Sequence, residues 1–199
     1  MRVLDLFCKA GGASMGLHWA WPDAEIVGVD IEPQSRYPFD FVLADAMMFP
    51  LAGFDFIWAS PPCQRFTLAG CVQRKNGIEY PDLIDVTRRR LAASGIPWVI
   101  ENVPGAPVRC DFLLCGSQFG LPIVRHRLIE CSFGAGLTPS CSHAIDVITI
   151  CGHGTPQWMR KRRLRLGLHP NASAAVKKLA KHDHPFSELH TQCAAPFQS

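Results

Sequence analysis

Short apolar runs that end in turn signals recur through the first 100 residues, and this pattern constrains the fold most. The runs are rich in β-branched and aromatic residues, which predicts buried strands, and the intervening segments include two with helical spacing. Strands that alternate with helices form right-handed βαβ units, which build a parallel sheet. We therefore expect an α/β fold, a mostly parallel sheet with helices on both faces. The predicted strands are 3–7, 25–29, 39–44, 54–59 and 98–100, and the predicted helices are 13–21 and 80–94.

The pattern loosens after Pro104. Three short apolar runs, 113–115, 128–131 and 147–151, are strand candidates, and 172–181 is a candidate for a short basic helix. The last 18 residues carry little pattern, so we expect them to be poorly ordered.

Composition excludes several classes of protein. With 199 residues, 48% hydrophobic and 19% charged, the chain fits one globular domain and is not disordered. Its longest stretch without Asp, Glu, Lys or Arg is 131–145, which is too short to span a bilayer, and Asp5 interrupts any signal peptide. Nine cysteines without a CxxC pair predict free thiols in a reducing compartment, which we take to be the cytoplasm.

The net charge of +3 is unevenly distributed. Residues 1–150 hold 12 Lys and Arg against 15 Asp and Glu, whereas 151–199 hold 8 against 2. A basic tail on an acidic body favours a polyanionic partner, although basic tails also serve as solubilising ends.

Three signals gather at the predicted carboxyl edge of the sheet, where such folds bind ligands. Gly11 and Gly12 follow the first strand, and they let the backbone approach a ligand closely. Asp30 ends the second strand and could accept both hydroxyls of a ribose, while Asp45 ends the third and could accept an adenine amino group. Alternatively, the two glycines serve only the geometry of the turn, and the two aspartates only cap helices. Together the signals favour an adenosine-type cofactor.

The segment that follows the fourth strand, Ser-Pro-Pro-Cys-Gln over 60–64, carries the strongest chemical signal. Two prolines stiffen the backbone and place Cys63 in a fixed, partly exposed position, as a nucleophilic thiolate requires. A structural cysteine in a tight turn is the alternative.

These motifs resemble those of the C5-cytosine DNA methyltransferases, a family that uses S-adenosylmethionine. Similar motifs occur in the family's order: Asp-Leu-Phe at 5–7 with the glycines, Pro-Pro-Cys-Gln at 61–64, Glu-Asn-Val at 101–103 and Arg-His-Arg at 125–127. The compact spacing resembles the short phage and actinobacterial members, which also suggests a restriction-modification setting. The resemblance implies a Rossmann-like class I methyltransferase fold, with a catalytic core over 1–130 and a reduced, basic, partly disordered target-recognition and C-terminal region over 131–199.

The resemblance also implies roles for individual residues. Cys63 would add to C6 of a flipped cytosine, Glu101 would hydrogen-bond the base, and Arg127 would hold the base or the Glu101 carboxylate. Double-stranded DNA would be the partner of a probable monomer. Residues implied to bind S-adenosylmethionine are Phe7, Gly11, Gly12, Asp30, Ile31, Asp45 and Pro62, and those implied to contact DNA are Gln64, Arg125, Arg160, Arg162 and Arg163.

The sequence departs from the family pattern in three places. Lys9 stands where the family usually has Gly, so its ammonium either points to solvent or lies near the methionine part of the cofactor, where it could bind a carboxylate or favour a carboxylated cofactor analogue. Ile123 replaces the usual glutamine before Arg125. The family's closing C-terminal helix has no counterpart, so the alternative is an inactive DNA-binding remnant or half of a split enzyme with a complementing C-terminal fragment.

Two Cys-x-His pairs, at 141–143 and 151–153, have Cys131 near them in the sequence. Two cysteines and two histidines can bind zinc, but this spacing is unusual. We therefore expect no metal and interpret these as turn and strand residues.

Overall fold

The computed structural model describes residues 1–67, 70, 74, 76–121, 123–134 and 136–143, and the backbone of 148–150 and 176–178. It divides into two compact units. The first comprises 1–112 and 128–136, and the second comprises 113–127 and 137–199. The boundary predicted between 130 and 131 falls inside a strand of the first unit and does not coincide with this division.

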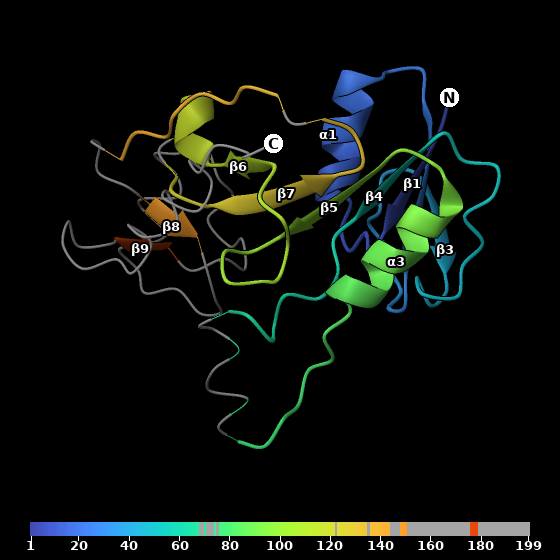
Figure 1. The fold of residues 1–199 in the computed structure, drawn as a ribbon, viewed down its shortest axis with the longest axis horizontal. Coiled ribbons are helices and arrows are strands. Elements are labelled where there is room, and N and C mark those ends of the chain that lie inside the picture. The colour runs from blue at the N-terminus through green and yellow to red at the C-terminus, as the bar shows by residue number, and fades with distance from the viewer. Residues whose placement is uncertain are drawn as a thin grey trace, which may run out of the picture. The chain divides into compact units, whose positions relative to one another are not determined.

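The central feature is a seven-stranded sheet with the order β3-β2-β1-β4-β5-β7-β6 (Figure 1). Pairs among the first five strands are parallel, and β7 runs antiparallel to β5. This order with an antiparallel β7 is that of the Rossmann-like class I methyltransferase fold, so the predicted fold class is confirmed. The strands are β1 (Arg2–Leu6), β2 (Glu25–Asp30), β3 (Asp40–Leu43), β4 (Phe56–Ala59), β5 (Trp98–Asn102), β6 (Phe112–Leu114) and β7 (Arg127–Cys131).

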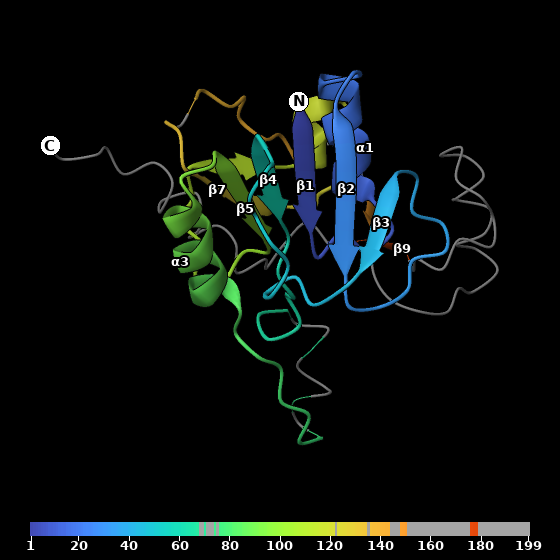
Figure 2. The same cartoon turned by 90° about the vertical axis from the view of Figure 1, so that its right-hand side faces the viewer.

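The helices of the first unit cover opposite faces of the sheet (Figures 1 and 2). Helix α1 (Gly12–Ala20) contacts the face that carries Asp5, through Ser14. Helix α3 (Ile84–Ser94) contacts the other face, where Arg88 binds Glu130 of β7. Between them lies an apolar core whose most buried side chains include Val3, Leu4, Leu6, Val29, Ile57 and Ile100.

Residues close in the sequence determine where α3 begins and ends. The helix begins at Ile84 and not at Tyr80 as predicted, because Pro81 disfavours helix in the residue before it and Asp82 accepts a hydrogen bond from the Ile84 N–H at 3.1 Å. It ends at Gly95, which adopts a left-handed conformation with φ of 69°.

One predicted element is wrong. The segment 172–181 contains a strand, β9 (Val176–Lys178), where we expected a helix. It pairs antiparallel with β8 (Ile148–Ile150) in a separate two-stranded sheet. Pairing with a distant strand outweighs the local preference, as it commonly does for short segments. The expected disorder of the tail lies outside the described residues. Within the part of the chain that is described, no helix is both long and apolar enough to cross a membrane.

Candidate active site

The carboxyl ends of the parallel strands β1 to β5 meet at one edge of the sheet, the lower edge in Figure 2. From β1 the chain runs outward to β2 and β3, and it then returns to β4 on the other side of β1. Such a reversal opens a crevice outside the strand ends, where α/β folds bind their ligands. The loops after β1 and β4 flank it, and the Ser60 N–H donates to the Leu6 carbonyl at 3.1 Å.

The β1–α1 loop is tightly folded. Phe7, Lys9 and Gly11 have positive φ angles of 60°, 44° and 81°. A Cβ at Gly11 would lie 2.8 Å from Cδ of Pro38, so only glycine fits, whereas a Cβ at Gly12 would meet nothing within 4 Å. Open space therefore lies at the start of α1. Gly11 is its N-cap and has no side chain to bond the first N–H groups.

Asp30 ends β2 and is buried. The N–H groups of Lys9 and Glu32 each donate to one of its carboxylate oxygens, at 3.0 Å. A carboxylate has about four acceptor sites, so these bonds orient Asp30 and leave capacity for two hydroxyl donors. This fits the predicted ribose contact.

The Lys9 side chain points toward this end of β2. Its Nζ lies 2.8 Å from Glu32 and 3.6 Å from Asp30. Two carboxylates therefore share the ammonium, and contact with the methionine part of a cofactor stays a prediction.

The other residues expected to bind the cofactor differ in exposure. Phe7 and Pro62 are half-buried at the strand ends. Asp45 is exposed and accepts the Met47 N–H at 2.8 Å, as a turn-capping residue does, and Ile31 is 71% exposed. Nothing in these contacts tests their predicted roles.

A hydrogen bond fixes the Ser-Pro-Pro-Cys segment to β5. Nδ2 of the buried Asn102 donates to the Pro61 carbonyl at 2.9 Å, and Oδ1 accepts the Val103 N–H at 2.9 Å. Asn102 therefore links the end of β5 to this segment. Cys63, two residues beyond Pro61, is half-buried.

Gln64 follows Cys63 and is exposed. Its carbonyl accepts Nη1 of Arg74 at 2.6 Å, which ties the loop to a later segment.

Cys8, another thiol near the crevice, is more deeply buried than Cys63. Cys8 is 6% exposed, and burial raises its pKa to about 12, with further contributions from Asp5 and Asp30. A thiol with that pKa stays protonated and unreactive near neutral pH. Cys110 is in a disulfide, so the expectation of free thiols is wrong at that position, whereas Cys8, Cys63, Cys115 and Cys131 are free.

Glu101 is the fourth residue of β5 and is half-buried. Strand register places it on the same face of the sheet as Asp5. Burial raises the pKa of Asp5 to about 7, and the negative charges of Asp30 and Glu101 add to this, while hydrogen bonding from Ser14 opposes it. The crevice thus gathers negative charge, which suits a cationic ligand.

Ser14 and Tyr37 form a hydrogen-bonded group with Asp5 that was not predicted. The Ser14 hydroxyl donates to Oδ2 of Asp5 and lies 2.5 Å from the Tyr37 hydroxyl. The other Asp5 oxygen is buried and has no hydrogen-bond partner among the described residues. Ser14 falls three residues after Gly11, but no sequence signal links it to Tyr37.

Arg125 and Arg127 belong to the second unit. Arg125 is exposed, and Arg127 is half-buried with Nη1 donating to the His126 carbonyl at 2.8 Å. The interaction of Arg127 with Glu101 or a base stays a prediction. Arg160, Arg162 and Arg163 lie outside the described residues.

The residues at the crevice fit S-adenosylmethionine by their chemistry. Asp30 offers acceptors for a ribose, the space at Gly12 admits a ligand to the start of α1, and the surrounding carboxylates suit a sulfonium cation.

No family model matches the chain, and no curated protein matches it. Among solved structures, the plantazolicin methyltransferase BpumL in complex with SAH is 15% identical with a TM-score of 0.34. Coclaurine N-methyltransferase bound to N-methylheliamine and SAH is 16% identical with a TM-score of 0.31. The similarities cover 52% and 51% of this chain, and 39% and 30% of those chains.

Proposed function

We propose that the chain transfers a methyl group from S-adenosylmethionine to C5 of a flipped cytosine in DNA. The observation that carries the proposal is the hydrogen bond from Asn102 to the Pro61 carbonyl. It joins the loop that bears Cys63, the proposed nucleophile, to the strand that bears Glu101, the proposed acid-base group, which supports their action on the same base. Resemblance of the motifs at 5–7, 61–64 and 101–103 supports the choice of substrate.

The chain's own residues would bind and orient the cofactor. Asp30 would accept the ribose hydroxyls, Asp45 the adenine amino group, and the loop from Phe7 to Gly12 would surround the remainder. When bound, S-adenosylmethionine supplies an electrophilic methyl group.

Cys63 and Glu101 would activate the base. Addition of the Cys63 thiolate to C6 turns C5 into an enamine carbon, which is nucleophilic enough to accept the methyl group. Glu101 would hydrogen-bond N3 and the exocyclic amine and so offset charge that builds on the ring. Loss of the C5 proton to a base and release of the thiolate from C6 restore the aromatic ring.

DNA is the proposed partner because C6 is inaccessible in a base stack, so the nucleotide must be extruded into the crevice. The exposed Gln64 and Arg125 would contact the nucleic acid, and the basic segment 160–165 would contact phosphates.

DNA that carries 5-fluorocytosine tests this function. After methyl transfer, fluorine occupies the position of the C5 proton, so the thiolate cannot be released and a covalent complex accumulates. We expect a denaturant-stable complex that requires S-adenosylmethionine and is absent from Cys63→Ser. Cys131→Ser is the matched control, because Cys131 is also a free thiol but is buried and bonds the Phe133 carbonyl.

The second candidate function is DNA binding without turnover, favoured by the excess of 8 Lys and Arg over 2 Asp and Glu in 151–199. It predicts DNA binding by the wild type with neither a covalent complex nor cofactor binding. If cofactor binds but no complex forms until a separate C-terminal fragment is added, the chain is half of a split enzyme.

A further inference from the structure

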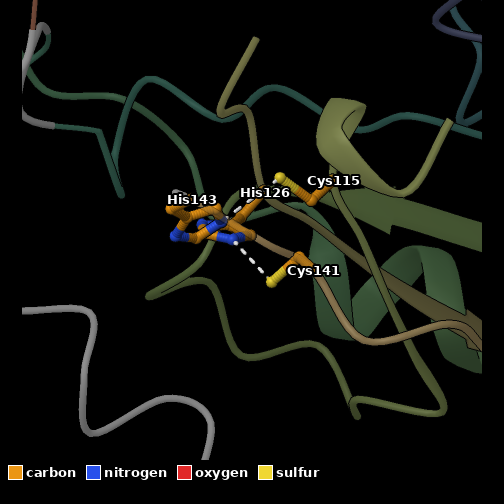
Figure 3. A group of neighbouring side chains, drawn as sticks. All are labelled: Cys115, His126, Cys141 and His143. Atoms are coloured by element: carbon orange, nitrogen blue, oxygen red, sulfur yellow. Dashed lines mark hydrogen bonds between the residues drawn. The ribbon is translucent and has the colours of Figure 1, made fainter. Parts of the chain in front are cut away.

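Four metal-binding side chains converge in the second unit (Figure 3). They are Cys115, His126, Cys141 and His143, and their ligand atoms all lie within 4.8 Å of one another. Sγ of Cys115 lies 3.6 Å from Nε2 of His143, and Sγ of Cys141 lies 3.6 Å from Nε2 of His126. The ring centroids of the two imidazoles, those of His126 and His143, are 5.0 Å apart.

These four ligands differ from the metal-binding residues that the sequence suggested. Cys141 and His143 form one of the two Cys-x-His pairs, but Cys151 and His153 lie outside the described residues. Cys131 bonds the Phe133 carbonyl at 2.7 Å instead. Cys115 and His126 complete the group from positions with no metal-ligand spacing, immediately after β6 and immediately before β7.

Hydrogen bonds hold the ligand-bearing segments together. Nε2 of Gln118 donates to the carbonyls of Leu113, at 3.1 Å, and Pro139, at 2.5 Å, while Oε1 accepts the Cys115 N–H at 2.8 Å. One side chain thus joins the chain around Cys115 to the chain that leads into Cys141. The Ser117 hydroxyl lies 3.3 Å from the Cys115 sulfur and can orient it, as groups around metal ligands commonly do.

Gly116 permits a second close contact between the ligand-bearing segments, with the backbone of Ile123. A Cβ there would lie 2.6 Å from the Ile123 carbonyl oxygen, so a larger residue would push apart the segments that carry Cys115 and His126.

We propose that Cys115, His126, Cys141 and His143 form a tetrahedral site for Zn²⁺. With Zn–S near 2.3 Å and Zn–N near 2.0 Å, a tetrahedral site separates sulfur from nitrogen by about 3.5 Å. The Cys115–His143 and Cys141–His126 sulfur–nitrogen distances, both 3.6 Å, match that separation. Two thiolates and two neutral imidazoles suit zinc, and binding releases the two thiol protons and leaves the site neutral.

Four protein ligands fill the coordination shell, so the site is structural and not catalytic. The ligands lie before and after β7, and a metal there would cross-link the segments of the second unit that flank that strand. Small units with a limited core commonly gain stability in this way. This inference is independent of methyl transfer.

Metal analysis of the full-length protein tests the proposal. Protein purified without chelator from zinc-supplemented cells should hold about one zinc per chain. His126→Ala and Cys141→Ser should each lose most of it, whereas His126→Cys, which keeps four ligands, should retain it. Cys63→Ser and Cys131→Ser are matched controls outside the cluster and should keep the wild-type content.

Cobalt substitution keeps the test decisive if a variant fails to fold. Wild-type protein loaded with Co²⁺ should show the intense visible bands of tetrahedral cobalt with sulfur-to-metal charge transfer, and His126→Cys should strengthen the charge-transfer band. The proposal is overturned if reduced wild-type protein retains no zinc after gel filtration, or if Cys131→Ser loses as much as Cys141→Ser. Either result leaves the Cys63 adduct assay unaffected.

Discussion

At the scale of single residues, Asp5 stands out because its carboxyl is fully buried, and one of its oxygens has no hydrogen-bond partner in the part of the chain that the structure describes. Burial raises its pKa from 3.8 to about 7. Between those values the folded protein holds a proton that the unfolded chain has released. The contribution of Asp5 to stability is therefore full below about pH 4 and is lost as the pH rises toward 7.

Asp5→Asn should remove this pH dependence. Three pKa units correspond to about 4 kcal/mol, so the unfolding free energy of the variant relative to wild type should increase by up to that amount between about pH 4 and pH 8. Urea unfolding across this range measures it, with the exposed Asp23→Asn as control. If the unfolding free energies of wild type and Asp5→Asn change in parallel with pH, Asp5 does not titrate in this range.

Lys9 combines a left-handed backbone with an ion pair. Lys9→Gly and Lys9→Ala both remove the ammonium, but only glycine adopts φ of 44° without strain. We expect Lys9→Gly to be more stable than Lys9→Ala by about 1 kcal/mol in chemical denaturation. Equal stability would mean that the loop relaxes to an ordinary conformation.

At the scale of elements, the bond from Asn102 to Pro61 couples β5 to the catalytic loop. Asn102→Asp keeps the acceptor for Val103 but loses the donor, and it leaves a buried carbonyl unsatisfied. We expect the 5-fluorocytosine complex to form about 10- to 100-fold more slowly, with S-adenosylmethionine affinity nearly unchanged. A uniform loss of cofactor and DNA binding would instead indicate general unfolding. Asn102→Ala, which loses both bonds, should be slower still.

Helix α3 is fixed to β7 by a buried ion pair. Arg88 donates from Nε and Nη2 to the two carboxylate oxygens of Glu130, at 2.7 and 2.8 Å, and Glu130 is 1% exposed. Arg88→Ala leaves that carboxylate buried without its main partner and should cost about 3–5 kcal/mol of unfolding free energy. Arg89→Ala, which removes only an exposed pair with Asp85, should cost less than about 1 kcal/mol. Similar losses in both variants would refute a special role for the buried pair.

The sequence predicted most elements of the first unit because each strand is a local apolar run that ends in a turn signal. Asp30 and Asn102 were identified at strand ends for the same reason. The helix expected over 172–181 was wrong because its conformation depends on pairing with β8, about 28 residues earlier in the chain.

At the scale of the whole molecule, sequence reasoning failed where contacts join distant segments. Cys115 and His126 meet Cys141 and His143 only after the chain has formed β7 between them. Neither residue belongs to a recognisable metal-ligand spacing, so no local pattern could have assigned them to a metal site. Ser14 and Tyr37 were missed for the same physical reason.

The uneven charge of the chain leads to the last prediction. The segment 160–165 holds five basic residues, and it either contacts phosphates or is simply solvated. Each phosphate contact releases condensed counterions. It therefore steepens the slope of a plot of the logarithm of the binding constant against the logarithm of the salt concentration by about 0.9. Arg160, Arg162 and Arg163 are the residues proposed to make such contacts.

Replacing Arg160, Arg162 and Arg163 with glutamine should therefore reduce the slope by about 3. Replacing Lys177, Lys178 and Lys181 removes the same net charge and should change the slope by less than about 1, because net charge acts on DNA only at long range. Fluorescence anisotropy with duplex DNA at several salt concentrations measures both. Equal changes in the two triple variants would identify 160–165 as a solvated basic segment, and the recognition of DNA would then have to come from the catalytic unit.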